Sequence, residues 1–114
     1  MEGLNNFTER FCNSVGCYNH PISHGKWYSL KKHNSNTHGV MGVFGWTHEL
    51  KRKGVFEVST YKKYTDSVGL SEYDDYKPKL AHGEPWVAFY LGKDSNENDY
   101  ERVVEIFKAI LQFV

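Results

Sequence analysis

The stretch CNSVGCYNHPISH, residues 12–24, places two cysteines and two histidines close together in the chain. Thiolate sulfur and imidazole nitrogen are the usual ligands of structural zinc, where four of them form a closed tetrahedron. The candidate ligands are Cys12, Cys17, His20 and His24. Their spacing departs from the common pattern, in which a pair on a tight turn is completed by a second pair further along the chain. We therefore expect unligated residues and no cofactor, with a zinc site or an oxidation-sensitive thiol pair as alternatives.

The remaining histidines suggest a second chemistry. A metal-independent RNase can use two histidines as acid and base and a lysine to stabilise the phosphate. His33 and His38 flank an expected turn beside Lys31 and Lys32. The sequence has no phosphate-binding glycine loop, nucleophile elbow or dinucleotide fingerprint. These observations lean against an enzyme and leave a small histidine-based hydrolase or RNase as the third functional hypothesis.

Any such site must be positioned by regular elements, and two segments have the spacing of amphipathic helices. The first covers residues 4–15 and is followed by Gly16, a residue suited to a left-handed cap. The second begins at Ser95 or Asn96, either of which can cap a helix. Its apolar face consists of Tyr100, Val103, Val104, Phe107, Ile110, Leu111 and Val114.

Four segments between these helices have the two-residue period of strands. They are Lys26–Lys32, Val40–Trp46, Val55–Tyr61 and Trp86–Leu91. The linkers HNSNTHG and THELKRKG suit hairpin turns, so the first three strands should form an antiparallel meander. Residues 62–85 are expected to form a long acidic loop or lid. The sequence thus predicts one α+β domain over residues 1–114, in the order α-β-β-β-β-α, with a mostly antiparallel sheet and both helices on one face.

Alternation along the strands assigns their side chains to two faces. The predicted core face carries Tyr28, Leu30, Met41, Val43, Phe56, Val58, Val87, Phe89 and Leu91. The opposite face would carry Trp27, Ser29, Lys31, Phe44, Trp46, Glu57, Ser59, Tyr61, Trp86, Ala88 and Tyr90. That second set is too aromatic for a plain solvated face. A slip of one residue would move a whole strand's set to the other side.

The composition fits one soluble domain, with 39% hydrophobic and 25% charged residues in 114 and a net charge of zero. The charge is uneven: residues 24–63 carry eight Lys or Arg against two Asp or Glu, and residues 64–105 carry four against ten. The basic half could bind phosphates, or the acidic half could neutralise it within the molecule. We expect no membrane segment and a cytoplasmic protein with reduced thiols.

Three functions remain open. The leading hypothesis is a non-enzymatic accessory or inhibitor protein that binds a protein partner, which could be a second copy of itself. The alternative is a single-stranded nucleic-acid or nucleotide binder that stacks bases on rings beside the basic 26–63 segment. The residues expected to bind are Trp27, Lys31, Trp46, Tyr61, Trp86 and Tyr90 on the sheet, with Tyr73, Asp74, Asp75 and Tyr76 in the acidic segment YDDYKPK.

Overall fold

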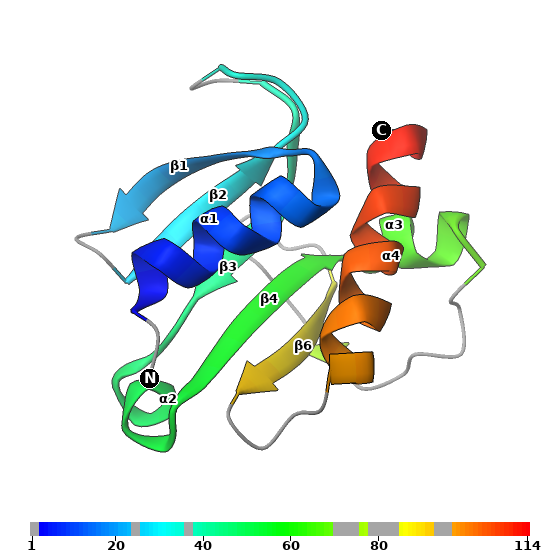
Figure 1. The fold of residues 1–114 in the computed structure, drawn as a ribbon. Helices are drawn as coiled ribbons and strands as arrows, with labels where there is room; N and C mark the ends of the chain where they lie inside the picture. Colours follow the sequence, from blue (N-terminus) through cyan, green and yellow to red (C-terminus); the bar gives the residue numbers. More distant parts are fainter. Residues whose placement is uncertain (1–2, 24–25, 36–37, 70–75, 78–84, 93–96) are drawn as a thin grey trace.

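Two amphipathic helices pack against one face of an antiparallel sheet in the computed structural model of this protein (Figure 1). The structure describes residues 3–23, 26–35, 38–69, 76–77, 85–92 and 97–114. Helix α1 spans Leu4–Val15 and ends at Gly16, whose φ of 92° lies in the left-handed region. Helix α4 spans Glu97–Phe113. Both predicted helices and the left-handed cap are confirmed.

The sheet has six strands in the described part of the chain, and every neighbouring pair is antiparallel. The strands are β1 (Tyr18–Ser23), β2 (Trp27–Lys31), β3 (Val40–Gly45), β4 (Val55–Tyr61), β5 (Tyr76–Lys77) and β6 (Trp86–Gly92). Their order across the sheet is β1-β2-β3-β4-β6-β5. The predicted α+β architecture and its four strands are confirmed. The strand count was too low, because β1 is polar and interrupted by Pro21 and β5 has only two residues.

Two expected loops contain short helices. Helix α2 spans His48–Lys53 within the THELKRKG linker, and the Thr47 side chain accepts a hydrogen bond from the amide of Leu50 at its start. Helix α3 spans Lys62–Ser67 and follows β4 directly. The prediction of one long loop over residues 62–85 was therefore wrong at α3 and β5. Residues 70–75 and 78–84 lie outside the described part of the chain.

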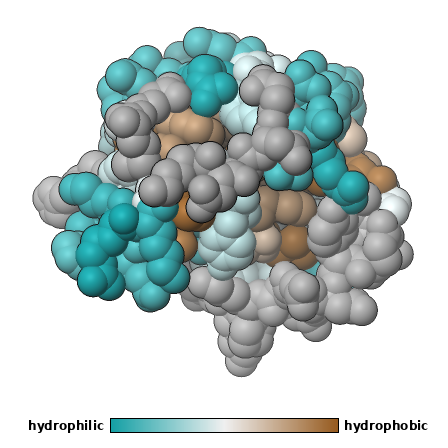
Figure 2. Space-filling view, turned by 60° about the horizontal axis from the view of Figure 1, so that its bottom comes forward, coloured by the Kyte–Doolittle hydropathy of each residue, from teal (hydrophilic) through white to brown (hydrophobic). Residues whose placement is uncertain are grey.

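An aromatic cluster forms the core between the helices and the sheet. The rings of Phe7 and Phe56 stack with their centroids 4.2 Å apart. The ring of Trp46 also stacks on Phe56, with a centroid distance of 5.0 Å. Phe11 of α1 contacts Phe107 of α4 at 5.5 Å. On the surface, Figure 2 shows apolar residues in the middle of the view, with hydrophilic residues above them and to their left. The cluster joins both long helices to the central strands.

The face assigned to β3 must be corrected. Phe44 pairs with Tyr28 on β2 and with Val58 on β4, so it shares their core face and is fully buried. Trp46 is also in the core, whereas Val43 belongs to the other face. The register shifts at the β2–β3 pairing and leaves Met41 as an extra residue, so that Met41 and Phe44 are both buried. A strict alternation therefore could not place this strand.

No helix in the described segments combines the length and apolar character that a membrane span requires.

Candidate binding face

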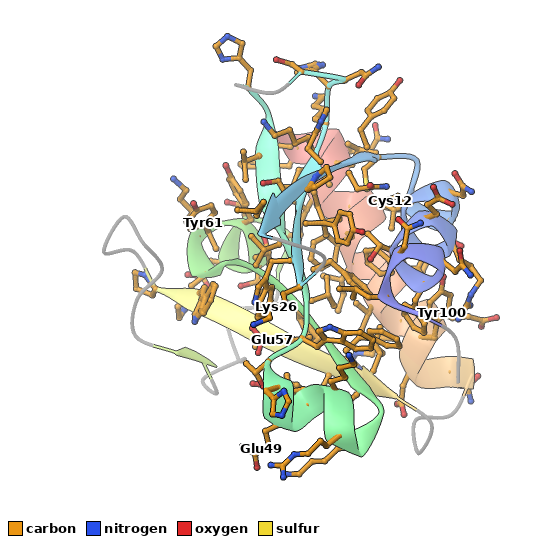
Figure 3. The ribbon with its side chains drawn as sticks, turned by 90° about the vertical axis from the view of Figure 1, so that its left-hand side faces the viewer. Cys12, Lys26, Glu49, Glu57, Tyr61 and Tyr100 are labelled. Carbon is orange, nitrogen blue, oxygen red and sulfur yellow. The ribbon has the colours of Figure 1, made fainter. Side chains whose placement is uncertain are left out.

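The sheet face that points away from α1 and α4 is called the outer face. Its side chains alternate with the core residues of β2, β3, β4 and β6. Its members are Trp27, Ser29, Lys31, Val43, Glu57, Ser59, Tyr61, Trp86, Ala88 and Tyr90. Figure 3 shows Glu57 and Tyr61 on this side of the sheet, away from the helix that carries Cys12.

One end of the outer face places two rings around a buried carboxylate. The strand register aligns Trp27, Gly45, Glu57 and Tyr90 in one row across four strands. Gly45 makes room for the indole, because a Cβ at this position would lie 2.4 Å from a ring carbon of Trp27. Tyr90 is 47% exposed and Trp27 is half-buried, whereas Glu57 is only 1% exposed. Solvent therefore reaches both rings but not the carboxylate.

The middle of the outer face is made of small side chains. Ser29, Val43, Ser59 and Ala88 form the adjacent row. The Ser59 hydroxyl donates a hydrogen bond of 2.8 Å to Oε2 of Glu57, and both residues are buried. A buried carboxylate is costly unless it is hydrogen-bonded, so this contact helps to hold the acid within the sheet. The sequence analysis did not predict this hydrogen bond, although Glu57 and Ser59 at alternate positions of β4 were a signal.

The other end of the outer face combines rings with a cation. Tyr61 and Trp86 are register partners and both are half-buried. Lys63 lies with its Nζ 5.3 Å from the ring centroid of Tyr61 and 5.5 Å from that of Tyr64. Such distances are typical of cation–π contacts. Trp86 Nε1 is buried and has no hydrogen-bond partner among the described residues.

The structure brings four of the predicted binding rings onto one face: Trp27, Tyr61, Trp86 and Tyr90. Trp46 is excluded from it, because the corrected register of β3 puts this ring in the core. Lys31 lies on the outer face but is 3% exposed. Tyr76 pairs through its backbone with Val87 in β6, so the end of the acidic segment joins the same sheet. Tyr73, Asp74 and Asp75 lie outside the described residues.

Three lysines of the basic segment have partners within the described part of the chain. Lys62 pairs with Asp66 at 2.9 Å, and Lys53 pairs with Glu49 at 3.2 Å. Lys32 donates a hydrogen bond to the carbonyl oxygen of Val114. The intramolecular neutralisation considered from the sequence is thus present at Lys62.

The candidate ligands of the alternative zinc site are divided between two sides of the sheet. Cys12 is buried in the core, and Cys17 packs against it. His20 pairs with Ser29, which places its side chain on the outer side of β1. His24 lies outside the described residues. Within the described ranges, no group of three or more His, Cys, Asp or Glu side chains could hold a metal ion.

The hairpin histidines lie in the connection between β2 and β3, and both are exposed. The two lysines considered as their partners are engaged elsewhere: Lys31 is buried, and Lys32 is bonded to the end of α4. Lys31 and Lys32 are therefore poorly placed to stabilise a phosphate at this tip.

No protein-family model matches this chain, and no match was found among curated proteins or among solved structures. The basis for a functional proposal is therefore the outer face itself.

Proposed function

We propose that this protein is a non-enzymatic binding protein that recognises a protein partner through its outer face. The observation that carries the proposal is the set of four rings, Trp27, Tyr61, Trp86 and Tyr90, that remain half-buried or exposed on the face opposite the core. Trp and Tyr are enriched at the energetic centres of protein interfaces, because each offers a large apolar area with one polar atom.

The charges support a protein partner over a phosphate backbone. Nucleic-acid binding draws much of its affinity from lysines and arginines that neutralise phosphates. Here Lys31 is buried, Lys32 is bonded to Val114, and Lys62 is paired with Asp66.

One observation favours a second candidate, a binder of single-stranded nucleic acid. Lys63 lies beside Tyr61, whose register partner is Trp86. A cation next to two rings is a feature of sites that stack bases and contact the backbone. This reading requires binding that quenches tryptophan fluorescence and weakens steeply as salt rises.

The test compares two variants that each remove one exposed ring. Tyr90→Ala changes the outer face, and Phe113→Ala removes a ring that is 59% exposed at the end of α4. Wild-type protein and both variants serve as baits for affinity capture, and affinities are then measured with each purified candidate partner. We expect Tyr90→Ala to weaken binding roughly tenfold or more, the scale of an interface hot spot, and Phe113→Ala to leave it unchanged.

Circular dichroism and thermal melting of both variants provide the folding control. A candidate partner that binds wild type and Tyr90→Ala equally well would contradict the proposal. A titration with a single-stranded oligonucleotide at low and high salt is run in parallel. Tight, salt-sensitive binding with tryptophan quenching would replace the protein-partner proposal with the nucleic-acid one.

A further inference from the structure

The end of α1 brings two cysteines together. The amides of Gly16 and Cys17 both donate to the carbonyl oxygen of Cys12, at 2.7 and 3.1 Å. With Gly16 in the left-handed conformation, this is a Schellman-type helix end. At such helix ends, the side chain of the second residue beyond the helix commonly packs against the residue whose carbonyl accepts the hydrogen bond. Here these two residues are Cys17 and Cys12, so the backbone turn brings their thiols side by side.

The two thiols interact directly and differ in their access to solvent. A hydrogen bond from the Cys17 thiol, assisted by one from Asn19, lowers the pKa of Cys12 against the opposing effect of burial. The same contact with Cys12, together with burial, raises the pKa of Cys17. Cys12 is 2% exposed, whereas Cys17 is half-buried. An external reagent therefore reaches Cys17 first, and the better stabilised thiolate lies behind it.

We propose that Cys12 and Cys17 form a reversible intramolecular disulfide by exchange with a low-molecular-weight disulfide such as oxidised glutathione. The turn suits this bond because its backbone hydrogen bond holds the two residues close, as the short reach of a disulfide requires. A bond at a partly exposed helix end is also accessible to reductants, which keeps it reversible. This modification site is independent of the outer face and of the proposed function.

The exchange proceeds in two steps. The pair first loses one proton to solvent, and the proton that remains in the contact between the two sulfurs shifts to Cys12, which leaves the accessible Cys17 sulfur as the thiolate. This thiolate attacks one sulfur of the small disulfide, forms a mixed disulfide and releases one small thiolate. Cys12 then loses its proton, and its thiolate attacks the Cys17 sulfur, forms the Cys12–Cys17 bond and releases the second small thiolate. The two protons lost by the protein end on the two released thiols. The protein is oxidised by two electrons, and the small disulfide is reduced by two.

The experiment treats the folded full-length protein with oxidised glutathione and follows the intact mass after acid quenching. We expect wild type to lose the mass of two hydrogens and to accept no alkylating reagent afterwards. Cys12→Ser should stop at a stable adduct of one glutathione on Cys17. Cys17→Ser should react roughly tenfold more slowly than Cys12→Ser, because its remaining thiol is buried in the core.

If a variant does not fold, the intact mass of the oxidised wild-type protein is sufficient to test the proposal. A wild-type product that keeps glutathione on Cys17, or that forms a disulfide between two chains on a non-reducing gel, would overturn it. The same reaction in concentrated urea is the matched control. There we expect adducts on both cysteines to accumulate, because the turn that aligns the thiols is lost; faster ring closure in urea than in buffer would also overturn the proposal.

Discussion

The two faces of the sheet bury opposite kinds of side chain. On the face that α1 and α4 cover, called the covered face, the buried side chains are mostly apolar, and rings such as Phe7 and Phe56 stack with their centroids 4.2 Å apart. On the outer face, the buried residues include Lys31, Glu57 and Ser59, while Tyr90 stays 47% exposed. Apolar burial stabilises a fold, whereas burying a carboxylate is a cost that hydrogen bonds only offset. The covered face is thus built for stability, and the outer face has a composition that stability alone does not favour.

The sharpest test of this contrast is the removal of one ring from each face. Phe44→Ala should lower the free energy of unfolding by about 3–5 kcal/mol, because it leaves a cavity in a fully buried cluster. Tyr90→Ala should lower it by less than about 1 kcal/mol, because the ring is already half in water. Urea denaturation measures both values. Equal losses would mean that the outer face is a second core.

Gly45→Ala tests whether the glycine is required on the outer face. A Cβ there would lie 2.2 Å from the Lys26 carbonyl oxygen and 2.4 Å from the Trp27 ring, so strand or ring must move. We expect a loss of about 1–3 kcal/mol in the free energy of unfolding, together with a change in tryptophan emission. Gly3→Ala is the control, because nothing lies within 4 Å of its added Cβ. A Gly45→Ala variant as stable as Gly3→Ala would show that Trp27 does not pack against the strand.

The sequence predicted the elements correctly where the hydrophobic residues recur at a regular helical or strand spacing. Helix α4 was recognisable because its apolar residues recur at helical spacing. The predicted capping residues, Ser95 and Asn96, lie outside the described part of the chain. Trp27, Tyr61, Trp86 and Tyr90 were assigned correctly to the outer face by alternation along their strands.

The errors in strand assignment arose where the structure departs from a regular alternation of side chains. The register shift beside Leu30 places Met41 and Phe44 on the same side. Gly42, next to the shift, was a weak signal, because a glycine inside a strand often marks a bulge. Strand β1 was missed because its sequence, YNHPIS, has little strand propensity and gains its pairing from β2. The hydrogen bond from Ser59 to Glu57 depends on side-chain rotamers, which spacing in the sequence does not fix.

Ser59→Ala examines the polar contact of the outer face. The change removes one donor from a carboxylate that is 1% exposed, and we expect a loss of about 1–2 kcal/mol in the free energy of unfolding. Ser29→Ala, a half-buried serine in the same row, is the matched control and should change stability by less than about 0.5 kcal/mol. If both variants lose the same free energy of unfolding, the hydrogen bond between Ser59 and Glu57 does not stabilise the protein.

Tyr28→Phe examines the corresponding polar contact of the covered face. The hydroxyl of Tyr28 donates a 3.2 Å hydrogen bond to Oδ1 of Asn5, and so connects β2 to the first turn of α1. Its loss should cost about 0.5–1 kcal/mol, less than the loss at Ser59, because the acceptor is neutral and Asn5 is exposed to water. A double-mutant cycle with Asn5→Ala isolates the pair, and its coupling energy should account for most of the single-variant effect. A coupling energy near zero would mean that the hydrogen bond between Tyr28 and Asn5 does not help to hold α1 on the sheet, so that the contact between Ser59 and Glu57 would be the more important of the two polar contacts.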